Sequence, residues 1–131
     1  MKKIILSLVF LLSSLSAELI NEYPTLKLIN SNTPIIDIRT PPEWVQTGIL
    51  KGAITIMFFD EKGGYDIKAF LKELNAKVDT TKKFALICHT GNRTGMVSDF
   101  LSKELHYKVI NLLGGMDYAE KKHFPIVPYK K

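Results

Sequence analysis

The sequence predicts an α/β fold in which helices cover both faces of a central parallel β-sheet. Two observations predict it. Short runs rich in β-branched residues alternate with segments of helical periodicity, and 46% of the 131 residues are apolar. Strands that are separated by helices pair in parallel, and a parallel sheet is buried on both faces. A chain of this length and apolar content can therefore form one domain around one core.

In the first half of the chain we expect two strands and two helices. Residues 34–38 indicate a short buried strand because they are rich in isoleucine. Thr40 is a suitable N-cap, and a proline follows it at a favoured first helical position, which predicts a brief helix over 41–46. A second strand is expected over 53–58. Apolar residues at positions i, i+3, i+4 and i+7 predict a helix over 66–76.

The second half repeats this alternation. The apolar run 84–87 predicts a third strand, and apolar residues at helical spacing predict a helix over 94–105. A fourth strand is expected over 109–112, followed by a glycine turn and a last helix over 116–122. Ligands of parallel sheets bind beyond the carboxyl ends of the strands, so the segment after residue 87 is a favoured place for a functional site.

Residues 1–17 have the features of a secretory signal peptide. Two lysines precede a largely apolar stretch over 4–12, and small residues follow up to Ala17. The apolar stretch is well short of the roughly 20 residues that span a bilayer, so we expect cleavage after Ala17 and no stable membrane span. Residues 18–131 would then form a single domain that is periplasmic or secreted.

The charge distribution argues against nucleic-acid binding. The net charge is +5, and Lys2 and Lys3 lie in the predicted signal peptide, which leaves +3 for the mature chain. The basic residues are scattered rather than clustered, which is not typical of a nucleic-acid interface. The His, Asp and Glu residues do not occur at the spacing of metal ligands either, so we expect no metal.

Cys88 is the only cysteine and directly follows the strand expected over 84–87. A lone cysteine is more often a buried core residue than a reactive one. Here a short polar loop containing Gly91 and Arg93 follows, and a helix is expected after it. Backbone N–H groups and a helix N-terminus around one sulfur favour the thiolate over the thiol. The pattern therefore favours a reactive sulfur, provided that solvent can reach it.

The loop from Cys88 to Arg93 has six residues. A loop of this length can direct the N–H groups of Thr90, Gly91, Asn92 and Arg93 toward the sulfur, with Gly91 at a positive φ. Arg93 is predicted to hold an anionic donor, assisted by Asn92 or Thr90. The alternative for Arg93 is an exposed residue at the start of a helix, with no specific contact.

The loop 88–94, Cys-His-Thr-Gly-Asn-Arg-Thr, resembles the active-site loop of the rhodanese family. Members of this family are sulfurtransferases that carry sulfane sulfur as a cysteine persulfide. Residues 36–44, continuing into 48–54, resemble the family's D-x-R, Glu-aromatic and G-H-I-x-G-A motifs. Residues 109–115 and 125–126 resemble its closing V-x-x-L-x-G-G and Pro-Val motifs. Three motifs in the right order make the resemblance specific.

The resemblance covers residues 19–127 and implies the rhodanese-like fold, with Cys88 as the catalytic nucleophile. It also implies that Asp37 and Arg39 organise the loop beneath the site and that Glu43 is a partner for a basic side chain. The residues expected to bind substrate are His89, Thr90, Gly91, Asn92, Arg93 and Thr94. The pair expected to form a turn beside the site is Gly114 and Gly115.

Some positions depart from the family pattern. Ile49 stands where the family usually has His, Ala119 where it usually has Trp, and His123 where Gly is common. None of these positions is expected to take part in the sulfur chemistry. The proline that often follows the second strand is also absent, and Phe58 and Phe59 stand in that region. These two rings are expected to pack in the core or to line a pocket wall.

By this resemblance the chain is a sulfurtransferase. Cys88 would take sulfur from a small anionic donor such as thiosulfate and pass it to a thiol, cyanide or protein acceptor, through a persulfide and without a cofactor. A periplasmic carrier that relays sulfur between proteins would need the same thiolate. A Cys-dependent phosphatase or arsenate reductase is less favoured, since its loop is one residue longer to hold a tetrahedral oxyanion.

Overall fold

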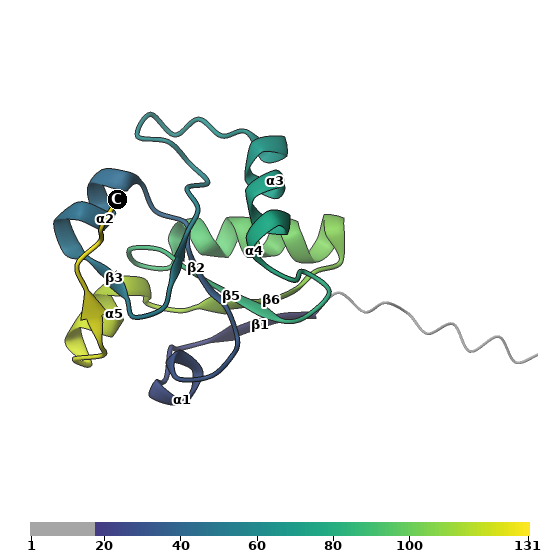
Figure 1. The fold of residues 1–131 in the computed structure, drawn as a ribbon. Coiled ribbons are helices and arrows are strands. Elements are labelled where there is room, and N and C mark those ends of the chain that lie inside the picture. Colours follow the sequence, from purple (N-terminus) through teal and green to yellow (C-terminus); the bar gives the residue numbers. More distant parts are fainter. Residues whose placement is uncertain (1–17) are drawn as a thin grey trace, which may run out of the picture.

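Five parallel strands form the central sheet, in the order β1-β6-β5-β2-β4 (Figure 1). The computed structural model describes residues 18–131, so the predicted signal peptide over 1–17 lies outside the described residues. The strands are β1 (Glu18–Glu22), β2 (Ile35–Asp37), β4 (Ile54–Thr55), β5 (Phe84–Ile87) and β6 (Lys108–Leu112). The predicted parallel sheet is thus confirmed, and β5, which Cys88 directly follows, lies at its centre.

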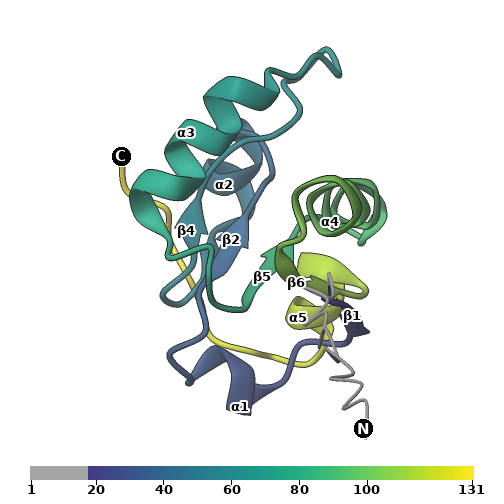
Figure 2. The ribbon, with the colours of Figure 1, turned by 90° about the vertical axis from the view of Figure 1, so that its right-hand side faces the viewer.

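Helices cover both faces of this sheet, as predicted (Figure 2). Helices α3 (Ile67–Lys77) and α4 (Asn92–Leu105) pack on one face. Helices α1 (Leu26–Ile29) and α5 (Gly115–Lys121) pack on the other. Helix α2 (Pro41–Thr47) follows β2 directly, at the carboxyl end of the sheet. Within residues 18–131, none of the helices combines the length and the hydropathy that crossing a bilayer requires.

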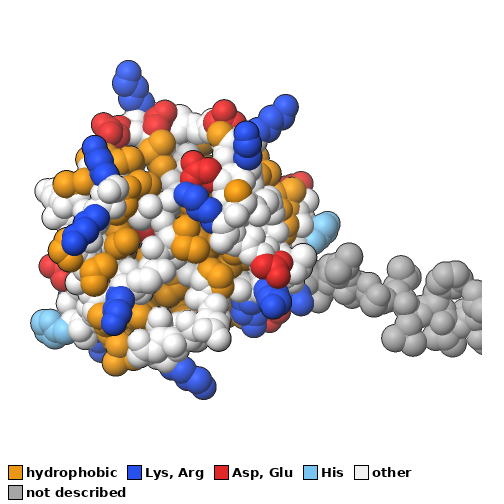
Figure 3. All heavy atoms as spheres, viewed as in Figure 1, with side chains coloured by type: hydrophobic (Ala, Val, Ile, Leu, Met, Phe, Trp, Pro, Cys, Tyr) orange, Lys and Arg blue, Asp and Glu red, His pale blue; other side chains and the backbone are white. Residues whose placement is uncertain are grey.

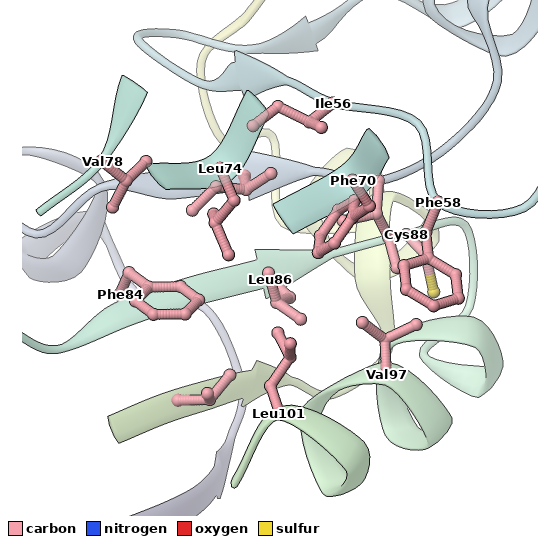
Figure 4. Close-up of a cluster of buried hydrophobic side chains, with 13 residues drawn as sticks. Ile56, Phe58, Phe70, Leu74, Val78, Phe84, Leu86, Cys88, Val97 and Leu101 are labelled. Atoms are coloured by element: carbon pink, nitrogen blue, oxygen red, sulfur yellow. The ribbon is translucent and has the colours of Figure 1, made fainter. Parts of the chain in front are cut away.

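The sheet separates two hydrophobic cores, because alternate residues of a strand point to opposite faces. All four residues of β5 are buried. Phe84, Leu86 and the following Cys88 belong to the core under α3 and α4 (Figure 4), whereas Ala85 and Ile87 belong to the core over α1 and α5. Cys88, the nucleophile predicted from the sequence, therefore directly follows a central strand and lies in the same core as its residues Phe84 and Leu86.

Two predicted boundaries are wrong in ways that affect the site. The strand expected over 53–58 ends at Thr55, although Phe58 N still donates to Ile38 O at 3.2 Å. The chain then bends into the connection that carries Phe58 and Phe59. Helix α4 begins at Asn92 rather than at residue 94, so Asn92 and Arg93 lie in its first turn and not in the loop. Their position reflects Gly91, which caps the helix with a φ of 101°.

The pattern along the chain did not predict β1, α1 or a second, two-stranded sheet. In that sheet β3 (Ile49–Leu50) pairs antiparallel with β7 (Ile126–Val127). The pairing brings the end of the chain onto α2, where the rings of Tyr129 and Trp44 lie 5.3 Å apart between centroids. Strands of two residues carry too little periodicity to be recognised, and their pairing joins distant parts of the sequence.

Candidate active site

Cys88 lies where β5 ends and the loop to α4 begins. Its Sγ accepts a hydrogen bond from the N–H of Gly91 at 3.2 Å and lies 3.5 Å from Thr94 Oγ1. The Gly91 N–H can reach the sulfur because Gly91 adopts the predicted positive φ, which glycine tolerates without steric penalty. Cys88, Gly91 and Thr94 therefore meet at the sulfur. Of the N–H groups of Thr90, Gly91, Asn92 and Arg93 that were predicted to point toward it, only that of Gly91 donates to it among the described residues.

The N-terminus of α4 is the second element of the site. The first N–H groups of a helix have no intrahelical acceptor, and together with the helix dipole they favour a negative charge at that end. The sulfur contacts the N-cap residue Gly91 and the third helical residue, Thr94. A thiolate or a persulfide anion at this position would be stabilised by fixed dipoles rather than by a mobile cation.

Helix α5 supports the loop from behind. The N–H groups of Met116 and Asp117 donate to the carbonyls of Cys88 and His89 at 2.8 and 3.0 Å. In a trans peptide, the C=O of one residue and the N–H of the following residue point in opposite directions. Because the carbonyls of Cys88 and His89 point toward α5, the N–H groups of His89 and Thr90 point away from it.

The two glycines before this contact allow it to form. A Cβ on Gly115 would fall within 2.6 Å of His89 O and closer still to Cys88 O. Gly114 and Gly115 both have a positive φ and form the expected turn beside the site. Only a residue without a side chain at position 115 lets the backbone of α5 come this close to the loop.

Arg93 binds Glu43 of α2. Nη1 and Nη2 of the guanidinium donate to Oε1 and Oε2 of the carboxylate at 2.7 and 2.8 Å. The hydrogen bonds from Arg93 are the main reason that the pKa of Glu43 falls to about 2, and in turn they raise the pKa of Arg93. Glu43 is thus the partner of a basic side chain, as the resemblance implies. The positive charge of Arg93, which was predicted to hold an anionic donor, is compensated by the carboxylate of Glu43. The donor-binding role of Arg93 stays a prediction.

Asp37 and Arg39 hold α2 in place. The Asp37 carboxylate accepts hydrogen bonds from Nε and Nη2 of Arg39 and from Nε1 of Trp44. Arg39 also donates to Thr47 Oγ1 at 2.6 Å and to Gly48 O at 2.7 Å. Both ion-pair partners are buried, so removal of either would leave an uncompensated charge in the interior. The pair reaches the loop indirectly, by fixing the helix that presents Glu43 to Arg93.

The accessibility of the sulfur differs from the sequence-based expectation. His89, Thr90 and Asn92 are exposed around the loop, whereas Cys88 is only 1% exposed. The expectation of a sulfur open to solvent is therefore wrong for this conformation. Figure 4 shows the sulfur beside the ring of Phe58, with Val97 of α4 near both. Phe58 combines the two roles considered for it, because it is buried in the core and also lines a pocket.

Two hollows lie near the site. One of about 690 Å³ lies between α2 and α3, and its lining residues do not include Cys88. A smaller groove of about 270 Å³ runs along α4 and shares Phe58 and Val97 with the core around the sulfur. Within residues 18–131, no three His, Cys, Asp or Glu side chains are grouped so as to hold a metal ion.

Comparison with known sequences finds one domain model. A family model described as "Rhodanese-like domain" matches residues 23–122, a range that contains the whole site. Uncharacterized protein RP600 of Rickettsia prowazekii (strain Madrid E) is 27% identical over 93 residues, which are 69% of this chain and 74% of that protein.

Solved structures show the same architecture. A rhodanese-related protein from Thermoplasma volcanium is 26% identical and superposes with a TM-score of 0.55, over 74% of this chain and 85% of the other. Reduced Bacillus anthracis CoADR-RHD is 26% identical with a TM-score of 0.61, over 85% of this chain and 18% of that protein. These neighbours share with this chain a central parallel sheet that is flanked by helices.

Proposed function

The chain belongs to the rhodanese-like domain family, and from this premise we propose that it is a sulfurtransferase that carries sulfane sulfur as a persulfide on Cys88. One observation carries the proposal. The Cys88 sulfur accepts the Gly91 N–H at 3.2 Å at the N-terminus of a 14-residue helix. This arrangement is suited to one negatively charged sulfur atom.

In the proposed first step, the Cys88 thiolate attacks the outer sulfur of a donor such as thiosulfate. A bond forms between Sγ and that sulfur, the S–S bond of thiosulfate breaks, and its electron pair leaves with sulfite. In the second step a thiolate or cyanide attacks the outer sulfur of the persulfide. The electron pair of the S–S bond then returns to Sγ, which regenerates the thiolate. No cofactor takes part.

The hydroxyl of Thr94 is proposed to hydrogen-bond to the sulfur in both of its charge states. Its hydroxyl donates to Gly91 O at 3.2 Å and lies 3.5 Å from Sγ. With a neutral thiol, the hydroxyl oxygen can accept from Sγ–H while it donates to the carbonyl. With a thiolate or persulfide, the hydroxyl can rotate and donate to the sulfur instead. The site therefore adapts to both charge states without movement of the backbone.

A sulfur carrier that is loaded by another protein is the second candidate. The burial of Cys88 favours it, because a donor in solution must displace a covering side chain before it reaches a sulfur that is 1% exposed. A protein partner that binds at the loop could displace that side chain as part of its own contact. Both candidates use the same persulfide and differ in how it is formed.

Mass spectrometry of the intact protein tests the proposal. Incubation with thiosulfate should add one sulfur atom to the wild type and none to Cys88→Ser, which keeps nearly the same side-chain volume and should remain folded. Steady turnover with cyanide would then identify an enzyme. Loading only by a protein persulfide would identify a carrier. If no sulfur is gained from any donor while the protein is folded, the proposed function is wrong.

A further inference from the structure

The larger of the two hollows, the cavity between α2 and α3, is separate from the cysteine loop (Figure 1). No residue of the loop 88–94 lines it. Its lining comes from α2, from β4 and the connection that follows it, from α3, and from the segment after β7. Its volume of about 690 Å³ is within the range of small-molecule sites. The proposed sulfur chemistry makes no use of this cavity, so we ask which other ligand it fits.

Two pairs of aromatic rings form part of its wall. The rings of Trp44 and Tyr129 lie 5.3 Å apart between centroids. Phe58 stacks on Tyr65 at 5.7 Å, with 19° between the two ring planes. Trp44 and Phe58 are buried and Tyr65 is 62% exposed, so the aromatic surface extends from the interior to solvent. Aromatic faces attract flat apolar groups and cations.

The charged side chains of the lining are mainly acidic: Asp60, Asp66, Glu73 and Lys77. Glu73 forms an ion pair with Lys77 at 3.3 Å. Within residues 18–131, neither Asp60 nor Asp66 takes part in an ion pair. Both belong to the connection between β4 and α3, which also carries Tyr65. Two uncompensated carboxylates therefore lie beside the exposed end of the aromatic wall.

Each of these two carboxylates uses one oxygen to hold the backbone. Asp60 Oδ1 accepts from the N–H groups of Lys62 and Gly64, both at 2.8 Å. Asp66 Oδ1 accepts from the N–H of Ala69 at 3.0 Å and so caps α3. The Oδ2 atoms of Asp60 and Asp66 receive no hydrogen bond from residues 18–131. The positions of both side chains are thus fixed, and one oxygen of each remains for a ligand.

The negative charge of the cavity is a local feature. The chain as a whole has a net charge of +5. On the face drawn in Figure 3, lysines and arginines are dispersed among acidic residues and hydrophobic side chains. An excess of carboxylates in a cavity attracts cations and repels anions. The cavity is therefore unsuited to an anionic sulfur donor and suited to a positively charged molecule.

We propose that the cavity between α2 and α3 binds a small organic cation that carries a flat amidinium or guanidinium group on an apolar body. The N–H groups of the cation donate to the carboxylates of Asp60 and Asp66, since such flat groups match carboxylates well. The apolar body stacks on the aromatic rings of the wall, where cation–π attraction also contributes. This inference is independent of the proposed sulfurtransferase function, because no step of the sulfur chemistry uses these residues.

The test compares benzamidine, benzamide and benzoate on the full chain. The three probes have nearly the same size and shape and are positive, neutral and negative. Trp44 is the only tryptophan and lines the cavity, so its fluorescence reports binding at this place. Titration calorimetry gives the affinity. We expect a Kd for benzamidine of about 1 mM or lower. Benzamide should bind about tenfold more weakly, and benzoate more weakly still.

Two double variants localise the charge effect. Asp60→Asn combined with Asp66→Asn removes two charges but keeps the oxygens that hold the backbone, so the chain should fold. It should weaken benzamidine binding by about fivefold or more and leave benzamide binding unchanged. Asp79→Asn combined with Asp99→Asn removes the same charge outside the cavity. This control should change the affinity for benzamidine by less than about twofold, because distant exposed charges are screened.

A second pair of variants tests the aromatic wall. Tyr129→Ala removes the ring beside Trp44 and should weaken both benzamidine and benzamide, each by about threefold or more. Tyr23→Ala is the control, since it removes a half-exposed ring that lies 4.8 Å from Tyr118, outside the cavity. It should leave both affinities unchanged. Calorimetry measures these affinities without relying on the fluorescence of Trp44.

Each outcome decides the proposal. Equal affinities for benzamidine and benzamide would overturn it, as would an unchanged Trp44 fluorescence at about 10 mM benzamidine. Equal losses in the two double variants would assign the effect to the general field of the protein and would overturn it as well. A preference for benzamidine that is lost in the cavity variant and kept in the control supports it. None of these measurements involves a persulfide, so this inference and the sulfurtransferase proposal can fail separately.

Discussion

Among single residues, Arg93 is the one whose contacts in the structure differ most from the role expected from the sequence. An arginine at the end of a Cys loop suggests an anion-binding group, because a guanidinium matches oxyanions well. In the structure both of its terminal nitrogens bind Glu43, which is 50 positions away. The guanidinium and the carboxylate are each about a quarter exposed, so the pair is only partly shielded from water. Arg93 therefore joins the start of α4 to α2, and its charge is available to a donor only when Glu43 releases it.

Glu43→Gln tests the strength of this pair through pH. The pKa of Glu43 is about 2 in the folded chain and 4.5 without its partners, so the folded state favours the ionised form. Its stabilisation is present in full well above pH 4.5 and is lost as the pH falls toward 2. At pH 7 we expect Glu43→Gln to lower the free energy of unfolding by about 1 kcal/mol, after allowance for solvent screening. Urea unfolding at several pH values measures both effects.

A control variant and a kinetic readout complete this experiment. Glu73→Gln removes the exposed ion pair with Lys77 and should change stability by less than about 0.5 kcal/mol. A difference between wild type and Glu43→Gln that persists at pH 2 would contradict the linkage to Glu43. The variant also frees Arg93, so a several-fold lower apparent KM for thiosulfate would show that this side chain can hold an anionic donor. An unchanged KM would leave Arg93 a positioning residue.

Among the elements, α5 is the one that shapes the loop without contributing a reactive group. Its first N–H groups donate to the carbonyls of Cys88 and His89, and Gly91, the N-cap of α4, supplies the N–H at the sulfur. The loop is thus held between two helix N-termini, one that binds its carbonyls and one that binds the Cys88 sulfur. The glycine turn before α5 makes this close approach possible.

Gly115→Ala tests the contribution of α5. The new Cβ would collide with the carbonyls of Cys88 and His89, and φ at this position is +57°. We expect the free energy of unfolding to fall by about 2 to 4 kcal/mol, from strain plus overpacking. The rate of persulfide loading should fall by about tenfold or more, because a misplacement of about 1 Å in a reacting group has large kinetic effects. Denaturant unfolding and intact mass provide the two measurements.

Gly52→Ala is the matched control for this change. Gly52 also has a positive φ, +83°, but a Cβ there would meet no heavy atom within 4 Å. It should lose only about 1 kcal/mol from backbone strain, with loading unchanged. Equal losses of loading in both variants would mean that general destabilisation, and not the contact with α5, explains the effect of Gly115→Ala.

For the whole molecule, the proposed cellular location follows from residues 1–17 of the sequence. Residues 1–17 have the basic start, the apolar stretch and the small-residue end that are typical of a secretory signal peptide. We propose that the domain acts outside the cytoplasm. After expression of the full chain in a Gram-negative host, N-terminal sequencing of the periplasmic fraction should give Glu18 as the first residue. Recovery of the uncleaved chain from the cytoplasm would contradict this.

Much of the fold could be predicted because its signals are local. The run 84–87 coincides with β5, and the predicted ends of the helices over 66–76 and 94–105 differ by at most two residues from α3 and α4. These elements are long and periodic or uniformly apolar. By contrast, β1 is a half-exposed edge strand, and β3 and β7 have two residues each. Such strands are recognisable only by their partners.

The amino-acid sequence alone predicts the parallel α/β arrangement and places Cys88 between a central strand and a helix N-terminus. Strand alternation, a glycine at positive φ and a helix start are properties of neighbouring residues. The packing of separate elements was needed to show that Glu43 binds Arg93, that α5 supports the loop, and that Cys88 is buried in one cluster with Phe58. These features depend on how separate elements pack, because burial and ion pairing arise between residues that are distant along the chain.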